Sequence, residues 1–220
     1  MKTPFPSACA AALLVAAFGC AGATHGSQPP AAEPRAIGST GSAAQADSSR
    51  MHFTDADVYF MTGMISHHAQ AVLIAGWAGS HGASPSVHTL CDRIVVAQHD
   101  EIVMMQRWLR DRHLPVPDGD ASHDNMPGMP HSMMMPGMLS PAQLAQLDSA
   151  RGSDFDRLFL TFMIQHHRGA VTMVNQLFGS PGGGEEEVVF KFASDVYADQ
   201  TTEITRMERM LMGLPGESGQ

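Results

Sequence analysis

The sequence predicts an all-α protein, an antiparallel four-helix bundle made of two repeated helical hairpins with a methionine-rich loop between them. Three observations lead to this fold class. A block with two adjacent histidines occurs twice, and a second shared block follows each copy. Capping residues, glycines and prolines mark the ends of four helices around these blocks. No segment alternates apolar and polar residues between hairpin turns, as strands of a β-hairpin would.

Two blocks make up the repeat. The first has the pattern M-I-x-H-H-x-x-A-V; it lies in residues 60–72 and recurs in residues 159–171. The second has the pattern Q-x-x-E-I-x-x-M; it lies in residues 98–105 and recurs in residues 200–207. A single hairpin of this size cannot bury its own apolar face. Two such hairpins would pair into a bundle with approximate two-fold symmetry.

Start and stop signals define the two helices of the first half. Thr54 and Asp57 form a capping-box pattern that opens the first helix, which should end at Gly79 and Gly82. The pair Ser84–Pro85 places an N-cap residue before a proline at the first helical position. Pro115 ends this second helix because proline cannot continue it.

The second half repeats these signals. Ser153 and Asp156 again suggest a capping box, and the third helix should stop at Gly179. Residues 185–187 are all Glu, and their negative charge favours the start of the fourth helix, which ends at Gly213.

The composition limits the classes of partner. The chain has 13 basic and 22 acidic residues, a net charge of −9, and no run of Lys and Arg, so we expect no nucleic-acid partner. The 17 methionines and 12 histidines are the unusual feature. Methionine specifies core packing poorly, so its abundance calls for a chemical explanation.

The first residues predict export from a bacterial cell. Lys2 gives a positive start, residues 8–18 are apolar but too few to span a membrane, and small residues precede Cys20. Cys20 resembles a bacterial lipoprotein cleavage site, where the cysteine is lipidated. The protein would then be anchored to the membrane by lipid alone, and plain secretion into the periplasm is the alternative.

Three parts of the chain follow from these signals. We expect a signal peptide at 1–19, a flexible Ala/Gly/Ser/Pro-rich linker at 20–50 and the bundle at 51–214. Within the bundle we expect repeat one at 54–112, the methionine-rich loop at 118–139, a short helix at 141–149 and repeat two at 153–213.

The repeated blocks carry candidate metal ligands. Adjacent residues of a helix point about 100° apart, so we expect one histidine of each pair to face inward. A methionine lies one turn before each pair, and Gln, Glu and Met form a stripe on each partner helix. The candidate ligands in the helices are Met64, His67, His68, Glu101, Met105, Met163, His166, His167, Glu203 and Met207. Alternatively, the methionines fill the core and a His–Glu hydrogen bond joins the helices without metal.

The predicted loop is the second candidate site. Prolines interrupt it, so its side chains cannot pack as one helical stripe. Thioethers beside imidazoles favour Cu(I), and by the same chemistry Ag(I). The candidate ligands in the loop are His123, Met126, Met129, His131, Met133, Met134, Met135 and Met138. The alternative is a flexible linker or an apolar docking patch.

With these motifs, the sequence resembles the bacterial domain-of-unknown-function family 305. The resemblance covers about residues 53–214 and includes FMxxMIxHHxxAV at 60–72 and the segment 155–160. It implies a ferritin-like four-helix bundle with Met/His metal sites, because some members are periplasmic copper-binding proteins of the CopM type. The first half has Ile74 where the second has Met173, which implies a weaker first site.

These features favour a binding protein over an enzyme. We expect an exported protein that binds Cu(I), with Ag(I) or Cu(II) as further cargo, for sequestration, chaperoning or resistance in the envelope. A copper-efflux system or a cuproprotein would exchange the ion. A lipoprotein with a structural or interaction role and no metal is the alternative. A di-iron oxidase ranks lower, because neither Glu101 nor Glu203 is followed by the histidine of a Glu-x-x-His motif.

Overall fold

Five helices make up the part of the chain that the computed structural model describes, residues 52–119 and 135–214. These residues belong to one unit of the chain, Thr40–Gln220. The helices are α2 (Asp55–Ala75), α3 (Pro85–Asp111), α4 (Pro141–Ser149), α5 (Ser153–Phe178) and α6 (Glu187–Met212). The described residues form no strand, which confirms the predicted all-α fold class.

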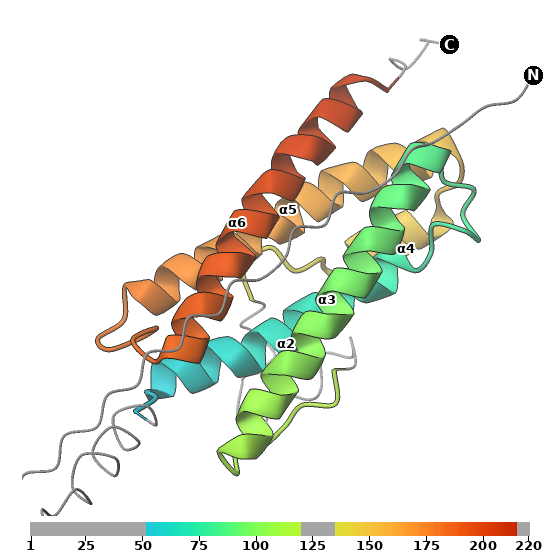
Figure 1. The fold of residues 1–220 in the computed structure, drawn as a ribbon. Helices are drawn as coiled ribbons and strands as arrows, with labels where there is room; N and C mark the ends of the chain where they lie inside the picture. Colours follow the sequence, from blue (N-terminus) through green and yellow to red (C-terminus); the bar gives the residue numbers. More distant parts are fainter. Residues whose placement is uncertain (1–51, 120–134, 215–220) are drawn as a thin grey trace, which may run out of the picture. The chain divides into compact units, whose positions relative to one another are not determined.

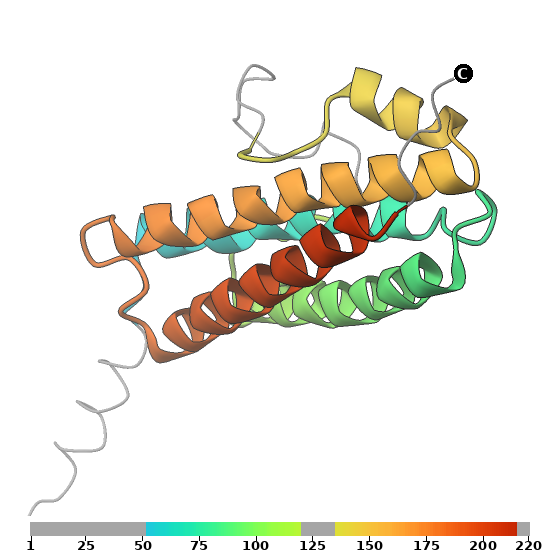
Figure 2. The ribbon, with the colours of Figure 1, turned by 90° about the horizontal axis from the view of Figure 1, so that it is seen from above.

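The four long helices form two layers (Figures 1 and 2). One layer holds α2 and α5, and the other holds α3 and α6. The hairpins α2–α3 and α5–α6 join across the α2–α5 contact, where the two helices run antiparallel. Helix α3 ends far from where α5 begins, and α4 packs on the outside of α5.

The helix ends of the first hairpin follow the sequence signals only in part. Thr54 caps α2 in the predicted capping box with Asp57. However, α2 ends at Ala75 and not at Gly79, because residues 76–82 form hydrogen-bonded turns that redirect the chain. Helix α3 begins with Pro85 at its first position, as expected.

The predicted capping box of the second half is wrong. Gly152, with a φ of 59°, stands at the N-cap of α5, and Ser153 is already helical. Asp156 instead accepts the backbone N–H of Ser84, at 3.1 Å, in the loop before α3. Its repeat partner Asp57 accepts the N–H of Gly184, at 2.7 Å, in the loop before α6. Each first-turn aspartate therefore holds the loop of the opposite hairpin.

A buried polar layer divides the core. On α2, Ile65 belongs to one apolar cluster and Ala71 to the other, and on α3 the same holds for Ile102 and Ile94. Buried polar side chains lie between the clusters, and we call the following six of them the polar layer: His67, His68, Gln98, His166, His167 and Gln200. The bundle thus places the four histidines of the repeat between its two apolar clusters. None of the described helices is long and apolar enough to cross a membrane.

Candidate metal centre

All four histidines of the repeat are fully buried. The prediction that only one of each pair faces inward is therefore wrong. Helix α2 packs against both α3 and α5, and α5 packs against both α2 and α6, so two directions from each central helix lead into the interior. Adjacent histidines still point apart, with ring centroids 6.3 Å apart in the first pair. They form an inner pair, His67 and His166, and an outer pair, His68 and His167.

The inner pair meets across the α2–α5 contact. The ring centroids of His67 and His166 lie 3.8 Å apart, with the planes tilted by 36°. His67 Nε2 donates to the Pro136 carbonyl at 3.0 Å. His67 Nδ1 and both ring nitrogens of His166 have no hydrogen-bond partner among the described residues. Such buried polar atoms are costly to leave unpaired, so the inner pair is a place where a ligand would be accommodated.

Burial keeps the inner histidines neutral. Burial, together with the nearby His68, lowers the pKa of His67 to about 3, against the opposing effect of the hydrogen bond to Pro136. Burial also holds the pKa of His166 well below its ordinary value, reinforced by the other three histidines. A neutral imidazole has one nitrogen lone pair to offer a metal. Since His67 Nε2 donates to a carbonyl, its lone pair lies on Nδ1.

The outer pair reaches the second layer. His167 Nε2 donates to Glu203 at 2.6 Å, which joins α5 to α6. His68 Nε2 lies 2.7 Å from the Glu101 carboxylate, within ion-pair distance but without hydrogen-bond alignment. Both glutamates keep about a fifth of their side chains exposed. The structural alternative, a His–Glu contact between helices, therefore describes the outer pair well.

The predicted methionines surround this layer. Those that the sequence placed beside the histidines are completely buried: Met64, Met105, Met163 and Met207. Both polar atoms of the Gln98 side-chain amide are buried without a hydrogen-bond partner among the described residues. The same is true of Gln200 Oε1. No three His, Cys, Asp or Glu side chains of residues 52–119 and 135–214 stand together in a way that could hold one metal ion. A metal at the inner pair would therefore need thioether ligands.

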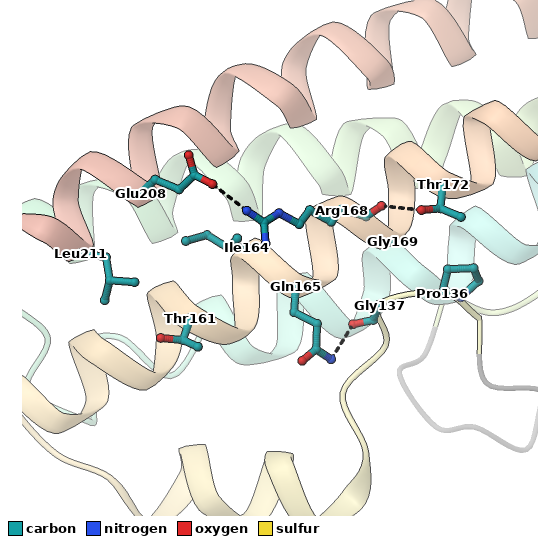
Figure 3. A pocket seen from close by; sticks show the side chains of 10 residues that line it. All are labelled: Pro136, Gly137, Thr161, Ile164, Gln165, Arg168, Gly169, Thr172, Glu208 and Leu211. Carbon is teal, nitrogen blue, oxygen red and sulfur yellow. Dashed lines mark hydrogen bonds and ion pairs between the residues drawn. The ribbon is translucent and has the colours of Figure 1, made fainter.

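The chain that leads into α4 lies directly on the inner pair. We call residues 135–139 the docked arm. Gln70 forms a reciprocal amide pair with the Leu139 backbone, accepting its N–H at 2.7 Å and donating to its carbonyl at 3.1 Å. From α5, Gln165 donates to the Gly137 carbonyl (Figure 3). The arm is thus bonded to both central helices.

An open cleft of about 660 Å³ is lined by residues of the docked arm, α5 and α6. Pro136 and Gly137 line it from the arm, and Gln165 and Gly169 line it from α5 (Figure 3). Across the cleft, Arg168 donates to Glu208 at 2.7 Å. This ion pair makes part of the cleft wall polar. None of the four histidines of the repeat lines the cleft.

Several candidates lie outside the described residues. These are Cys20, with the predicted signal peptide and linker, and the loop ligands His123, Met126, Met129, His131, Met133 and Met134. Met135 and Met138 are described, and both belong to the docked arm. Met138 and Leu139 are buried, whereas Met135 is half-buried against the core cluster that contains Met64.

Sequence reasoning missed the residues that hold the docked arm. Gln70, Gln165 and Gly169 carry no ligand pattern, but each occupies a position where the two halves of the repeat differ. Asp199 was also missed: partial burial raises its pKa, and the nearby carboxylates of Glu101 and Glu203 raise it further. A comparison of the two halves position by position would have drawn attention to the first three residues.

Comparisons with known proteins agree with this fold. A DUF305 protein from Streptomyces coelicolor, described as secreted, is 28% identical with a TM-score of 0.60, over 75% of this chain and 97% of that one. CopM in its Cu(I)-bound form is 26% identical with a TM-score of 0.56, over 75% of this chain and all of the other. CopM is also known in Cu(II)-bound and silver-bound forms. No curated protein matches the chain.

The family comparison covers most of the bundle. The model of the domain of unknown function DUF305 matches residues 57–211, which include both hairpins and the docked arm. The match confirms the resemblance inferred from the repeated histidine blocks. Because it spans more than half of the chain, and DUF305 structures share the fold, this protein belongs to the DUF305 family.

Proposed function

We propose that this protein is an exported binding protein for Cu(I) and Ag(I), which sequesters the ion or passes it on in the bacterial envelope. One observation carries the proposal: the neutral, fully buried inner pair has three ring nitrogens without a partner among the described residues and lies between two core clusters that contain four buried methionines. Soft thioethers and imidazoles suit Cu(I) and Ag(I) better than Mg²⁺, Ca²⁺ or Mn²⁺.

The relatives support the same cargo. CopM, which shares the fold at 25–27% identity, carries Cu(I), Cu(II) or silver in its structures. A neighbour described as secreted supports export. Lipidation of Cys20 and exchange of the ion with a copper-efflux system or a cuproprotein remain parts of the proposal. We propose binding and release of the ion rather than catalysis.

Ligand roles divide by location. In the bundle we assign the inner pair with Met64 and Met163 as principal ligands, and Met105 and Met207 as further thioethers. Glu101 and Glu203, which contact the outer histidines, would offer oxygen ligands to Cu(II), which accepts harder donors. In the loop, we assign the histidines and methionines between His123 and Met138 as additional soft ligands.

A competition titration tests the function. Metal-free wild type and a disabled variant are titrated with Cu(I) against a colorimetric Cu(I) chelator. The disabled variant carries His67→Leu, His166→Leu, Met64→Leu and Met163→Leu, with every loop methionine replaced by leucine. We expect the wild type to take copper from the chelator and the disabled, still helical variant to fail. Equal copper retention by the two proteins would refute the proposed function.

The structural alternative has support at the outer pair alone, since His167 and Glu203 satisfy each other without metal. Metal analysis of protein purified from copper-supplemented cells separates the two functions. We expect stoichiometric copper in the wild type. A metal-free protein of full stability would favour a lipoprotein with a structural role.

A further inference from the structure

Apart from His67, the two halves of the repeat differ at the positions that the docked arm touches. Gly63, Ser66 and Gln70 in the first block correspond to Phe162, Gln165 and Gly169 in the second. Two further positions differ, Met61 against Leu160 and Ala69 against Arg168, whereas the methionine, the isoleucine and both histidines at the centre of the blocks are the same. The sequence has therefore departed from its two-fold symmetry where one side of the inner pair receives residues 135–139.

Gly63 leaves room for two thioethers. A Cβ at this position would lie 3.0 Å from Met135 Sδ and 3.3 Å from Met173 Cε. Its repeat partner Phe162 is a large side chain and leaves no such gap. Gly63 lies one turn before His67 on the same face of α2, so the Met135 thioether enters the bundle about one helical turn from the inner pair.

Gly169 lets the backbone of the docked arm approach α5. A Cβ on Gly169 would lie only 1.9 Å from the Pro136 carbonyl oxygen, and one on Gly137 would lie 2.6 Å from the Gln165 carbonyl oxygen. Gly137 also has a φ of 79°, which disfavours other residues. Glycine is required at both positions for the arm to lie where it does.

The arm also sets the state of the inner histidine. The Pro136 carbonyl, held in place by this approach, accepts from His67 Nε2 at 3.0 Å. A carbonyl oxygen can only accept, so Nε2 carries the proton of the ring and Nδ1 keeps its lone pair. This type of contact orients metal-bound histidines in many proteins. One five-residue segment thus supplies both a thioether and the group that fixes the imidazole.

We propose that the docked arm completes a composite site for one soft monovalent ion, with Met135 Sδ, His67 Nδ1 and His166 as ligands. The site is asymmetric, because Phe162 stands on the other hairpin at the position equivalent to Gly63. Pro136 is a positioning residue that acts through His67. This inference rests on the proposed function and specifies its ligands: the inner pair supplies two imidazoles, and the docked arm adds the Met135 thioether to those that Met64 and Met163 offer from the helices.

The first test replaces the thioether alone. Met135→Leu keeps the size and apolar character of the side chain, and Met104→Leu is a matched control, since Met104 is half-buried against the same core cluster. In the Cu(I) competition titration, we expect Met135→Leu to weaken the tightest site about tenfold or more. The control should bind like wild type. Unchanged affinity in Met135→Leu would overturn the composite site.

The second test examines the position of the arm without metal. In the metal-free protein, ¹⁵N NMR should show His67 as the Nε2–H tautomer. Gly169→Ala places a methyl group against the Pro136 carbonyl, so we expect a mixed tautomer and a copper affinity lower by about 10-fold to 100-fold. Circular dichroism checks that this variant folds. A protonated Nδ1 in wild type, or an unchanged tautomer in a folded Gly169→Ala, would overturn the inference.

The two tests separate this inference from the proposed function. If the wild type fails to bind copper better than the disabled variant, the function itself is wrong. If the wild type binds copper and Met135→Leu binds equally well, the function holds and only the composite site is wrong.

Discussion

At the scale of single residues, the inner and outer histidines differ in what their ring nitrogens contact. His167 donates to Glu203, whereas His166 has no partner for either nitrogen among the described residues. A satisfied buried polar group adds to stability, but an unsatisfied one costs free energy. Replacing His166 should therefore raise the free energy of unfolding, whereas replacing His167 should lower it.

We expect His166→Leu to raise the free energy of unfolding of the metal-free protein by about 1–3 kcal/mol, because it removes an unpaired buried imidazole. Urea denaturation of metal-free protein measures the change. The same variant should lose copper affinity, as expected where a binding site is maintained at a cost in stability.

The control for this prediction is His167→Leu. It breaks the bond to Glu203 and should lower the free energy of unfolding by about 1–3 kcal/mol. If His166→Leu destabilises the protein as much as this control does, the inner pair has a structural role and the assignment of its unpaired nitrogens to metal is wrong.

At the scale of elements, the two first-turn aspartates join the hairpins. Asp57 accepts from Gly184, and Asp156 accepts from Ser84. We expect Asp156→Ala to lower the free energy of unfolding by about 2 kcal/mol, because it leaves a loop N–H of the opposite hairpin without its charged acceptor. Denaturant unfolding measures this effect.

The matched control is Asp154→Ala, an exposed aspartate in the same turn of α5. It removes the same charge from the helix start, so its effect should stay below about 1 kcal/mol. Equal effects of the two substitutions would mean that helix charge, and not the contact with Ser84, accounts for the role of Asp156.

Asp57 and Asp156 also show when a sequence pattern predicts the start of a helix correctly. The pattern of Thr54 and Asp57 identified the true start of α2, because a capping box is a local interaction. The same pattern at Ser153 and Asp156 gave the wrong cap, because Asp156 bonds to a loop that lies 72 residues away in the sequence. Local signals predict a helix end only where no distant partner competes for the capping side chain.

At the scale of the whole molecule, the repeat predicted the bundle and the polar layer but not the burial of all four histidines. The sequence identifies which faces are amphipathic, whereas the number of neighbours around α2 and α5 depends on how the hairpins pair. The docked arm escaped prediction for a related reason. Its contacts with Gln70 and Gly169 join segments that are distant in the chain, and only the broken symmetry of the repeat marks them.

The buried inner pair gives the whole molecule a pH-dependent stability. Burial lowers the pKa of His67 to about 3 and holds that of His166 well below its ordinary value. In the unfolded chain both imidazoles should have a pKa near the ordinary value of about 6.5. Above that pH the histidines are neutral in both states and add no pH dependence. Below it the unfolded state binds more protons, so stability falls as the pH falls from about 6.5 towards 3.

We therefore expect the metal-free protein to lose roughly 2 kcal/mol of unfolding free energy per inner histidine between pH 7 and pH 5, measured by urea denaturation. Carboxylates also begin to titrate in this range, so the comparison needs variants. His67→Leu with His166→Leu should remove most of the loss. His88→Leu, at a histidine on the surface of α3, should retain it. An equal loss in the double variant would show that the inner histidines are not the neutral, desolvated groups from which the metal-binding proposal starts.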